Sequence, residues 1–209
     1  FRLGIFSMFI STTVGVLFGI IAALRQGKVI DRVVMVAATL GIAVPSFVVA
    51  TVSIIIFSVQ LRLLPAYGFD SFSQYIMPGF ALSFSSLSFM ARLMRSSMLD
   101  VIHQDYIKTA RAKGVSRGFI IFKHALRNAI IPIVTYLGPL SAGILTGSFV
   151  VEKIFNIPGL GRYFVESITQ RDYPTILGVT IFYGAFLIAM NFLVDLSYGV
   201  IDPRIKIQE

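Results

Sequence analysis

Residues 105–132 read DYIKTARAKGVSRGFIIFKHALRNAIIP, a basic, helix-compatible segment between two stretches that are apolar enough to cross a membrane. Eight of the chain's 18 Lys and Arg residues lie between Arg92 and Arg127. This concentration of charge comes with no obvious catalytic chemistry. The segment is therefore typical of a docking surface on a membrane protein.

The overall composition excludes a soluble globular domain. Hydrophobic residues make up 56% and charged residues 13% of the 209 residues, whereas soluble domains carry about 25% charged residues. The net charge of +8 comes from basic residues in short loops between apolar runs, which is the pattern of cytoplasmic loops and does not indicate a nucleic-acid partner. The chain has no cysteine, so disulfides and thiolate chemistry are excluded. We expect an all-α polytopic membrane protein in a lipid bilayer.

Five segments are long and apolar enough to be transmembrane helices, each needing about 20 residues. They are residues 3–24, 33–59, 75–94, 129–151 and 174–200. Thirteen Lys and Arg residues flank these segments on one side and four on the other. Because positive charge marks the cytoplasmic side, we expect the C-terminus in the cytoplasm. The odd number of spans and the start at Phe1 inside an apolar run predict a missing sixth, N-terminal helix.

Proline and small residues mark irregular points in the spans. Pro45 should kink the second span, because proline removes a backbone donor from the helix. Pro139, Gly143 and Gly147 recur every four residues in the fourth span and form a small-residue stripe along which another helix can approach closely.

Polar residues within the spans are candidates for a substrate pathway. Ser83 and Ser86 belong to a hydroxyl-rich third span, where they either line a hydrophilic path or bond to carbonyls one turn back. Thr135 in the fourth span and Asn191 in the last complete this candidate pathway. Asp195 lies near the inner end of the last span, so we expect it to pair with an arginine of the loop that carries the eight basic residues from Arg92 to Arg127, which we call the basic loop.

Motifs for catalysis are missing from the sequence. It contains no GxxxxGK[ST] phosphate loop, so we do not expect this chain to bind ATP itself. His103 and His124 are the only histidines, and neither has the spacing of a metal site. We therefore expect no catalytic residue, metal or cofactor in this chain.

The basic loop predicts two short helices. Asp105 can cap the first at its N-terminus and Gly114 can close it, and Ser116 can cap a second helix that runs toward Asn128. Both a soluble partner and anionic lipid headgroups are possible contacts for the first helix. Its predicted apolar face consists of Tyr106, Ile107 and Ala110. Its basic residues are Lys108, Arg111 and Lys113.

Four stretches of the sequence together resemble the membrane-spanning permease subunit of bacterial ABC importers in the dipeptide, oligopeptide and nickel family. They are DYIKTARAKG (105–114), HALRNAIIP (124–132), TGSFVVEKIFNIPGLGRYFVESITQRDYP (146–174) and VDLSYGVIDPRIK (194–206). The resemblance covers nearly the whole chain. It implies one permease domain over residues 1–209, with a cytoplasmic coupling loop at about 95–128 and an outer loop at about 152–174 whose turn contains Pro158, Gly159 and Gly161.

In this family a motif of Glu-Ala-Ala, three variable residues and Gly forms the coupling helix that docks on the ATPase subunit. Counted back from Gly114, Lys108 stands at the Glu position, and Thr109 and Ala110 stand at the two Ala positions. The resemblance implies that the whole segment couples to the ATPase: Asp105, Tyr106, Ile107, Lys108, Thr109, Ala110, Arg111, Ala112, Lys113 and Gly114.

The resemblance also implies partners and a location. It predicts a bacterial inner-membrane complex that contains a second, similar permease, two ATPase subunits that bind ATP and Mg²⁺, and an extracellular or periplasmic protein that delivers peptide. The pathway would work by alternating access. One alternative is an importer of nickel or another small solute. The other is a secondary transporter or channel without ATPases, which predicts ionisable residues in mid-membrane and broken pseudo-symmetric helices that are not evident in the sequence.

Overall fold

The structure is a computed structural model that describes residues 1–145 and 148–201, and within these residues all regular secondary structure is helical. The elements in chain order are α1 (Arg2–Leu24), α2 (Val29–Ala43), α3 (Ser46–Ser53), the π-helix η1 (Ile54–Gln60), α4 (Phe72–Ile102), α5 (Asp105–Ala112), α6 (Arg117–Phe119), the π-helix η2 (Ile120–Ala125), α7 (Leu126–Ala129), α8 (Ile131–Leu145), α9 (Phe149–Ile154), α10 (Leu160–Gln170) and α11 (Tyr173–Ile201).

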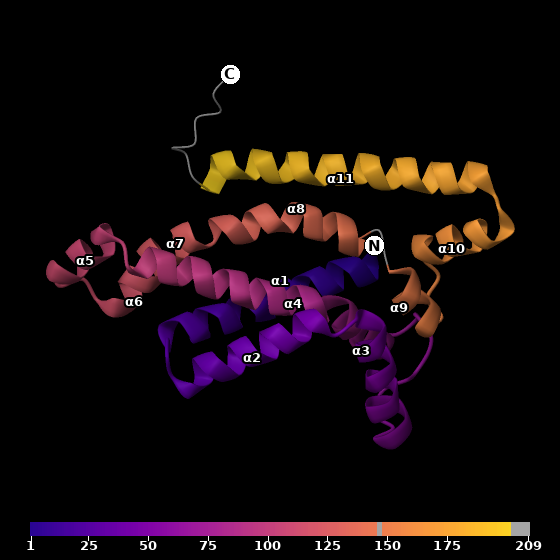
Figure 1. Cartoon of the computed structure of the whole chain (residues 1–209), viewed down its shortest axis with the longest axis horizontal. Helices are drawn as coiled ribbons and strands as arrows, with labels where there is room; N and C mark the ends of the chain where they lie inside the picture. The colour runs from indigo at the N-terminus through magenta and orange to yellow at the C-terminus, as the bar shows by residue number, and fades with distance from the viewer. Residues whose placement is uncertain (146–147, 202–209) are drawn as a thin grey trace.

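The centre of the molecule is the pair of long helices α1 and α4, which lie side by side (Figure 1). On α1 the buried residues Ser7, Ser11, Gly15, Gly19 and Ala23 recur every four positions, so they form one stripe of small side chains along the helix. A Cβ atom on Gly19 would lie 2.6 Å from the Ala91 carbonyl oxygen on α4. The two helix backbones can therefore approach this closely only because the stripe is small.

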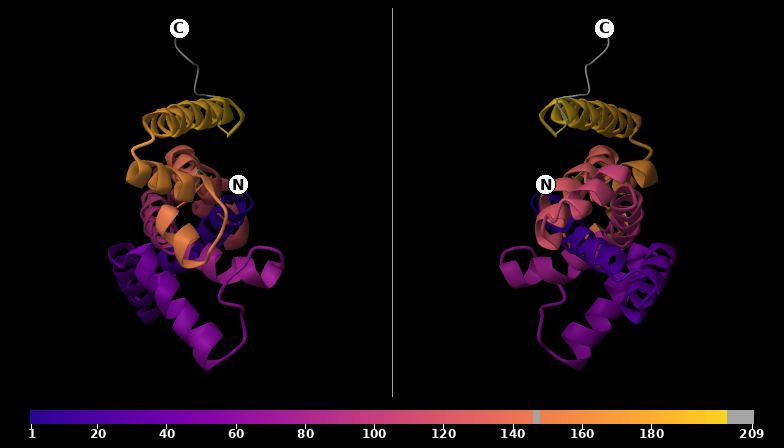
Figure 2. Two further views of the ribbon diagram at one scale, coloured as in Figure 1. Left: turned by 90° about the vertical axis from the view of Figure 1, so that its right-hand side faces the viewer. Right: turned by 90° about the vertical axis from the view of Figure 1, so that its left-hand side faces the viewer.

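The second span is broken rather than kinked at Pro45. Val44 adopts an extended backbone (ψ 120°), because the ring of a following proline disfavours the helical conformation. Pro45 then precedes α3, and the pair Val29–Ala43 and Ser46–Gln60 is bent by 103°. The sequence correctly predicts that Pro45 disrupts this span, but the disruption is a break into two helices and not a kink, and it turns α3 and η1 away from the line of the bundle (Figures 1 and 2).

Helix α11 forms a separate layer above α8, on the opposite side of the molecule from α3 (Figure 2). It contacts α8 and α10. None of the side chains in its span window Tyr173–Leu193 is buried. The hydrophobic core instead lies among α1, α4, α8 and the helices that follow α4, with Met90, Met94 and Met98 fully buried at its centre.

Four stretches qualify as membrane spans: Arg2–Leu24, Phe72–Ile102, Ile131–Ile154 and Tyr173–Leu193. The bent pair of α2 with α3 and η1 makes a fifth when it is counted as one span. The prediction of an all-helical, multi-pass membrane protein with about five spans is confirmed. The third span is longer than predicted, because α4 continues through Arg95 to Ile102 before the chain turns.

The predicted stripe on the fourth span is left uncovered by the described part of the chain. Pro139 and Gly143 are exposed, and a Cβ atom on Gly143 would meet no heavy atom within 4 Å. Gly147 lies outside the described residues. The stripe that brings two helices together within the chain is instead the one on α1.

Candidate functional site

The basic residues gather at one end of the helix bundle, which we call the basic end: the turn between α1 and α2 together with residues 103–128 (Figure 1). Helix α5 lies at its tip. Gln104 is the N-cap residue of α5 and no side-chain capping bond forms, so the prediction that Asp105 caps the helix is wrong. Asp105 is the first helical residue, and its carboxylate pairs with Lys108 Nζ at 2.9 Å. An acidic residue in the first turn still interacts favourably with the helix dipole.

The other end of α5 is closed by backbone hydrogen bonds. Gly114 adopts φ +75°, the left-handed conformation that glycine reaches without steric cost. The Gly114 N–H donates to the Arg111 carbonyl at 3.0 Å, and the Val115 N–H donates to the Ala110 carbonyl at 3.2 Å. These two bonds form a Schellman motif. The prediction that Gly114 ends this helix is confirmed.

One face of α5 is seated in the protein and the other is exposed. Ile107 is fully buried in the core, and Ala110 packs against the same cluster. Tyr106 is exposed, and its hydroxyl accepts a hydrogen bond from Asn128 Nδ2 at 2.7 Å. The predicted apolar face therefore consists of Ile107 and Ala110, while Tyr106 bonds to the next helix. The other residues of the segment, all exposed, are Asp105, Lys108, Thr109, Arg111, Ala112, Lys113 and Gly114.

The second predicted helix is present and consists of three consecutive elements, α6, η2 and α7. Ser116 is its N-cap residue, but its side chain makes no capping bond. The middle of this helix has the wider π-helical winding, which is often found near functional sites. Ser97 on α4 donates to the Ala129 carbonyl at 2.8 Å and fixes the far end of the helix.

The two histidines take part in local contacts. His103 Nδ1 lies 2.7 Å from the Leu99 carbonyl, and the His124 ring meets Phe119 edge to face. Among the residues that the structure describes, no group of three or more His, Cys, Asp or Glu side chains could hold a metal ion.

A buried ion pair joins α2 to α4 near the basic end. Asp31 is 3% exposed and accepts two hydrogen bonds from Arg95, from Nε at 2.5 Å and from Nη2 at 2.8 Å. The Gly27 N–H donates to the same carboxylate at 2.9 Å, and Arg92 donates to Thr39 Oγ1 at 2.6 Å. Arg92 and Arg95 therefore bind α2, although the sequence grouped them with the basic loop. The side chain of Asp195, predicted to pair with that loop, lies outside the described residues.

The outer loop is built around a buried carboxylate. Glu152 on α9 is 5% exposed and accepts the Arg162 N–H at 3.1 Å. A Cβ atom on Gly159 would overlap this carboxylate, and one on Gly161 would lie 2.7 Å from the Phe149 nitrogen. The two glycines of the predicted turn after Pro158 thus let the chain wrap around Glu152. The loop also holds a helix, α10 (Leu160–Gln170), that was not predicted from the sequence.

The four candidate pathway residues lie on three helices. The Ser83 hydroxyl is buried and donates to the Phe80 carbonyl at 3.0 Å, which is the local alternative to lining a path. Ser86 and Asn191 are half-buried on α4 and α11, and Thr135 is exposed on α8, where its hydroxyl donates to the Ile131 carbonyl. Their role in a pathway stays a prediction.

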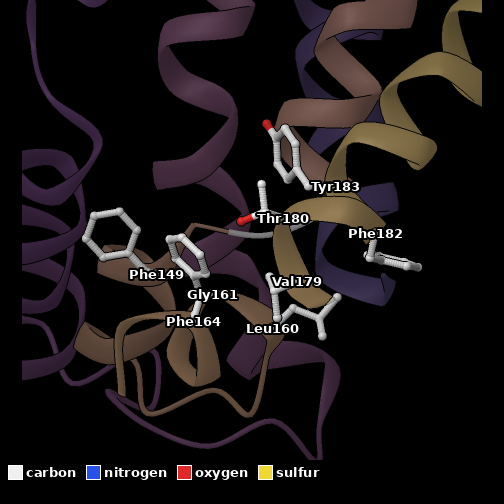
Figure 3. A pocket seen from close by; sticks show the side chains of 8 residues that line it. All are labelled: Phe149, Leu160, Gly161, Phe164, Val179, Thr180, Phe182 and Tyr183. Atoms are coloured by element: carbon white, nitrogen blue, oxygen red, sulfur yellow. The ribbon is translucent and has the colours of Figure 1, made fainter. Parts of the chain in front are cut away.

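A cavity of about 380 Å³ lies between α9 and α10 on one side and α11 on the other. Figure 3 shows Phe149 and Phe164 on the first side and Val179, Thr180 and Tyr183 on the second. The lining is mainly aromatic and aliphatic, so this cavity suits an apolar group better than a charged one.

These features define a multi-pass membrane protein with a helix closed by Gly114 at a basic end and, in its described residues, no metal-binding cluster. Residues 15–207 match the family described as "Binding-protein-dependent transport system inner membrane component". The chain belongs to this family. The resemblance found in the sequence is confirmed, and the family places the chain among the subunits of such transport systems.

Relatives support the same family. The chain is 53% identical over 209 residues to a dipeptide transport system permease protein of Bacillus subtilis, covering all of this chain and 68% of the relative. It is 42% identical to an oligopeptide transport system permease protein of Escherichia coli, covering 98% of this chain and 68% of the relative. A solved structure of the MetNI methionine ABC transporter, inward facing, matches with TM-score 0.76 and 17% identity over 96% of this chain and 92% of that one. This last similarity shows the fold alone.

Proposed function

We propose that the chain is the permease subunit of an ATP-driven importer and forms part of a transmembrane pathway for dipeptides or oligopeptides. Two relatives that extend over nearly the whole chain, at 53% and 42% identity, are named as permeases for these two substrates. The pathway opens to either side by alternating access, and Ser83, Ser86, Thr135 and Asn191 are its candidate lining residues.

The observation that carries the coupling role is the seating of α5. Ile107 anchors one face in the core, the Tyr106–Asn128 bond and the backbone bonds at Gly114 fix the helix, and its basic face remains exposed. A partner that pushes on this face would move the core contacts of Ile107, because a short helix fixed at both ends transmits displacement as a unit. The segment from Asp105 to Gly114 is therefore the proposed contact with the ATPase.

The proposed assembly contains a second, similar permease, two ATPase subunits and an external substrate-binding protein. The ATPase subunits bind ATP and Mg²⁺, so this chain is a non-catalytic subunit. ATP shifts the conformational equilibrium only through its different affinity for the two states. The basic end faces the cytoplasm, as expected for a concentration of Lys and Arg, and the C-terminal end of α11 lies at the same end (Figure 1).

The test uses the full-length protein assembled with its ATPase subunits, partner permease and binding protein in proteoliposomes. Ala112→Trp places a bulky side chain on the exposed side of α5 without entering the core. We expect loss of ATPase co-purification and of peptide-stimulated ATP turnover. The matched control is Gly118→Trp, because an added Cβ at Gly118 meets no heavy atom within 4 Å. The control should keep both activities.

Two results would contradict the proposal in different ways. Normal peptide-stimulated turnover by a well-expressed Ala112→Trp variant would exclude α5 as the coupling surface. Stimulation of the unaltered complex by Ni²⁺ and not by peptide would exclude the substrate class and leave the coupling role in place.

A further inference from the structure

A second cavity lies at the basic end, between the α1–α2 turn and the helices of the basic loop. Its volume is about 570 Å³. Arg25 and Lys28 line it from the turn, Arg111 from α5 and Arg117 from α6. Four positive side chains from three separate parts of the chain thus converge on one hollow.

No carboxylate among the described residues pairs with these four side chains. Asp31 is close to Lys28 in sequence, but its carboxylate is engaged by Arg95 and by the Gly27 N–H. Converging like charges repel, and the repulsion is relieved when an anion binds between them.

Apart from Gln26, the rest of the lining is apolar and includes Leu24 and Ile102. Leu24 is the last residue of the α1 span and Ile102 the last residue of the α4 span, so the cavity lies where two spans end. Basic pockets at this depth bind anionic lipid headgroups. A free anion would have no use for the apolar part of the wall, whereas a phospholipid presents a phosphate next to its acyl chains.

We propose that this cavity binds a phosphate ester, supplied by the headgroup of an anionic phospholipid, and that the bound lipid ties the α1–α2 turn to α5. This inference goes beyond the transport function and does not depend on it. The lipid occupies the hollow between the turn and α5, to which α5 contributes Arg111, and the other exposed residues of α5 stay open to a protein partner.

The test compares the full-length protein in vesicles of phosphatidylcholine alone, of phosphatidylcholine with phosphatidylglycerol, and of phosphatidylcholine with added glycerol 3-phosphate. Bound phosphatidylglycerol is counted by native mass spectrometry after purification, and bound glycerol phosphate by equilibrium dialysis. The variant is Arg25→Gln/Lys28→Gln/Arg117→Gln, in which all three replaced side chains are exposed and lie outside the core. The control, Arg62→Gln/Lys153→Gln/Arg171→Gln, removes the same charge from exposed residues away from the basic end.

We expect the protein to retain phosphatidylglycerol, and each removed basic residue to weaken retention about fivefold. The control variant should retain the lipid as the unaltered protein does. Binding of glycerol phosphate by the unaltered protein and not by the variant would support the phosphate site. It would also show that the bound phosphate group can come from a soluble ester as well as from a lipid headgroup. Equal retention of phosphatidylglycerol by the unaltered protein and the variant, with no binding of glycerol phosphate, would overturn the proposal.

Discussion

Helices α1 and α11 are almost identical in hydropathy and are packed in opposite ways. Their span windows have mean hydropathies of 2.1 and 2.0. In α1 28% of that window is buried inside the chain, and in α11 none of it is. Hydropathy therefore identifies both as membrane spans, but it does not tell which span the chain packs against itself.

The difference lies in the small residues. The glycines of the stripe on α1 lie against α4, and added Cβ atoms at Gly15 and Gly19 would collide with α4. On α11, Gly178 and Gly184 have no heavy atom within 4 Å of an added Cβ. Lipid tails are as apolar as leucine, so close backbone approach and polar pairs decide which membrane helices associate. We call α1, α2 and α4 the packed half of the chain.

The largest expected effect comes from removing the polar pair of the packed half. Asp31→Asn leaves the Arg95 guanidinium without its carboxylate in a mostly buried site, and breaking such a pair costs about 3 kcal/mol. Reversible unfolding in mixed micelles should show this loss. The control is Asp100→Asn, an exposed carboxyl on α4, which should change stability little. Equal stability of the two variants would mean that the ion pair does not hold α2 on α4.

The next effect separates α1 from α11 directly. Gly19→Ala puts a methyl group 2.6 Å from both the Ala91 carbonyl oxygen and Met94 Cβ, so α1 must move away from α4. Overpacking of this kind costs about 2 kcal/mol. Gly184→Ala makes the same substitution in open space on α11. We expect the first variant to unfold at lower denaturant and the second to match the unaltered protein, and the reverse order would refute the comparison.

Much of the fold was predictable from local signals. The spans at residues 3–24 and 174–200 agree with α1 and α11 within one residue at each end, because hydropathy alone defines them. The closure of α5 at Gly114 was predictable because glycine has one strong structural reason to follow a short helix. Its N-cap was misplaced by one residue, since Gln104 and Asp105 are both possible starts.

The unpredicted features depend on contacts between distant residues. Asp31 and Arg95 are 64 positions apart, and Arg95 resembled a loop residue because charge lowers the hydropathy of any window that contains it. In the sequence, Glu152 does not differ from the other charged residues of the outer loop. In the structure it is buried, and the backbone at Gly159 and Gly161 passes close to its carboxylate. Nothing in the local sequence distinguishes a buried carboxylate from an exposed one.

A smaller effect is expected at the C-terminal end of α5, where the need for glycine comes from the backbone conformation and not from packing against another helix. Gly114→Ala forces a side chain into the left-handed conformation that closes α5, at a cost of about 1 kcal/mol. Gly118→Ala adds the same methyl group inside α6, where there is open space. Hydrogen exchange at the Gly114 and Val115 amides should speed up in the first variant only. Unchanged exchange there would show that the backbone bonds at this end do not need glycine.

The smallest expected effect concerns the start of α11, which side-chain packing does not hold. Asp172 accepts the Thr175 hydroxyl at 2.6 Å and the Thr175 N–H at 3.2 Å, and these bonds hold the pKa of Asp172 below its usual value. A lowered pKa means that the carboxylate stabilises the helix start above about pH 3.9, its value in the unfolded chain. The stabilisation is lost as the pH falls through the lower folded-state pKa.

Hydrogen exchange of the first-turn amides of α11 should therefore show protection that falls as the solution is acidified. Asp172→Asn cannot ionise, so its protection should be low throughout and independent of this titration. Asp70→Asn, which removes an exposed carboxyl far from α11 in sequence, is the control and should keep the acid dependence. If Asp172→Asn keeps the acid dependence as well, the Asp172–Thr175 bonds do not hold the start of α11. Neither side-chain burial within the chain nor these bonds would then fix this end of the helix.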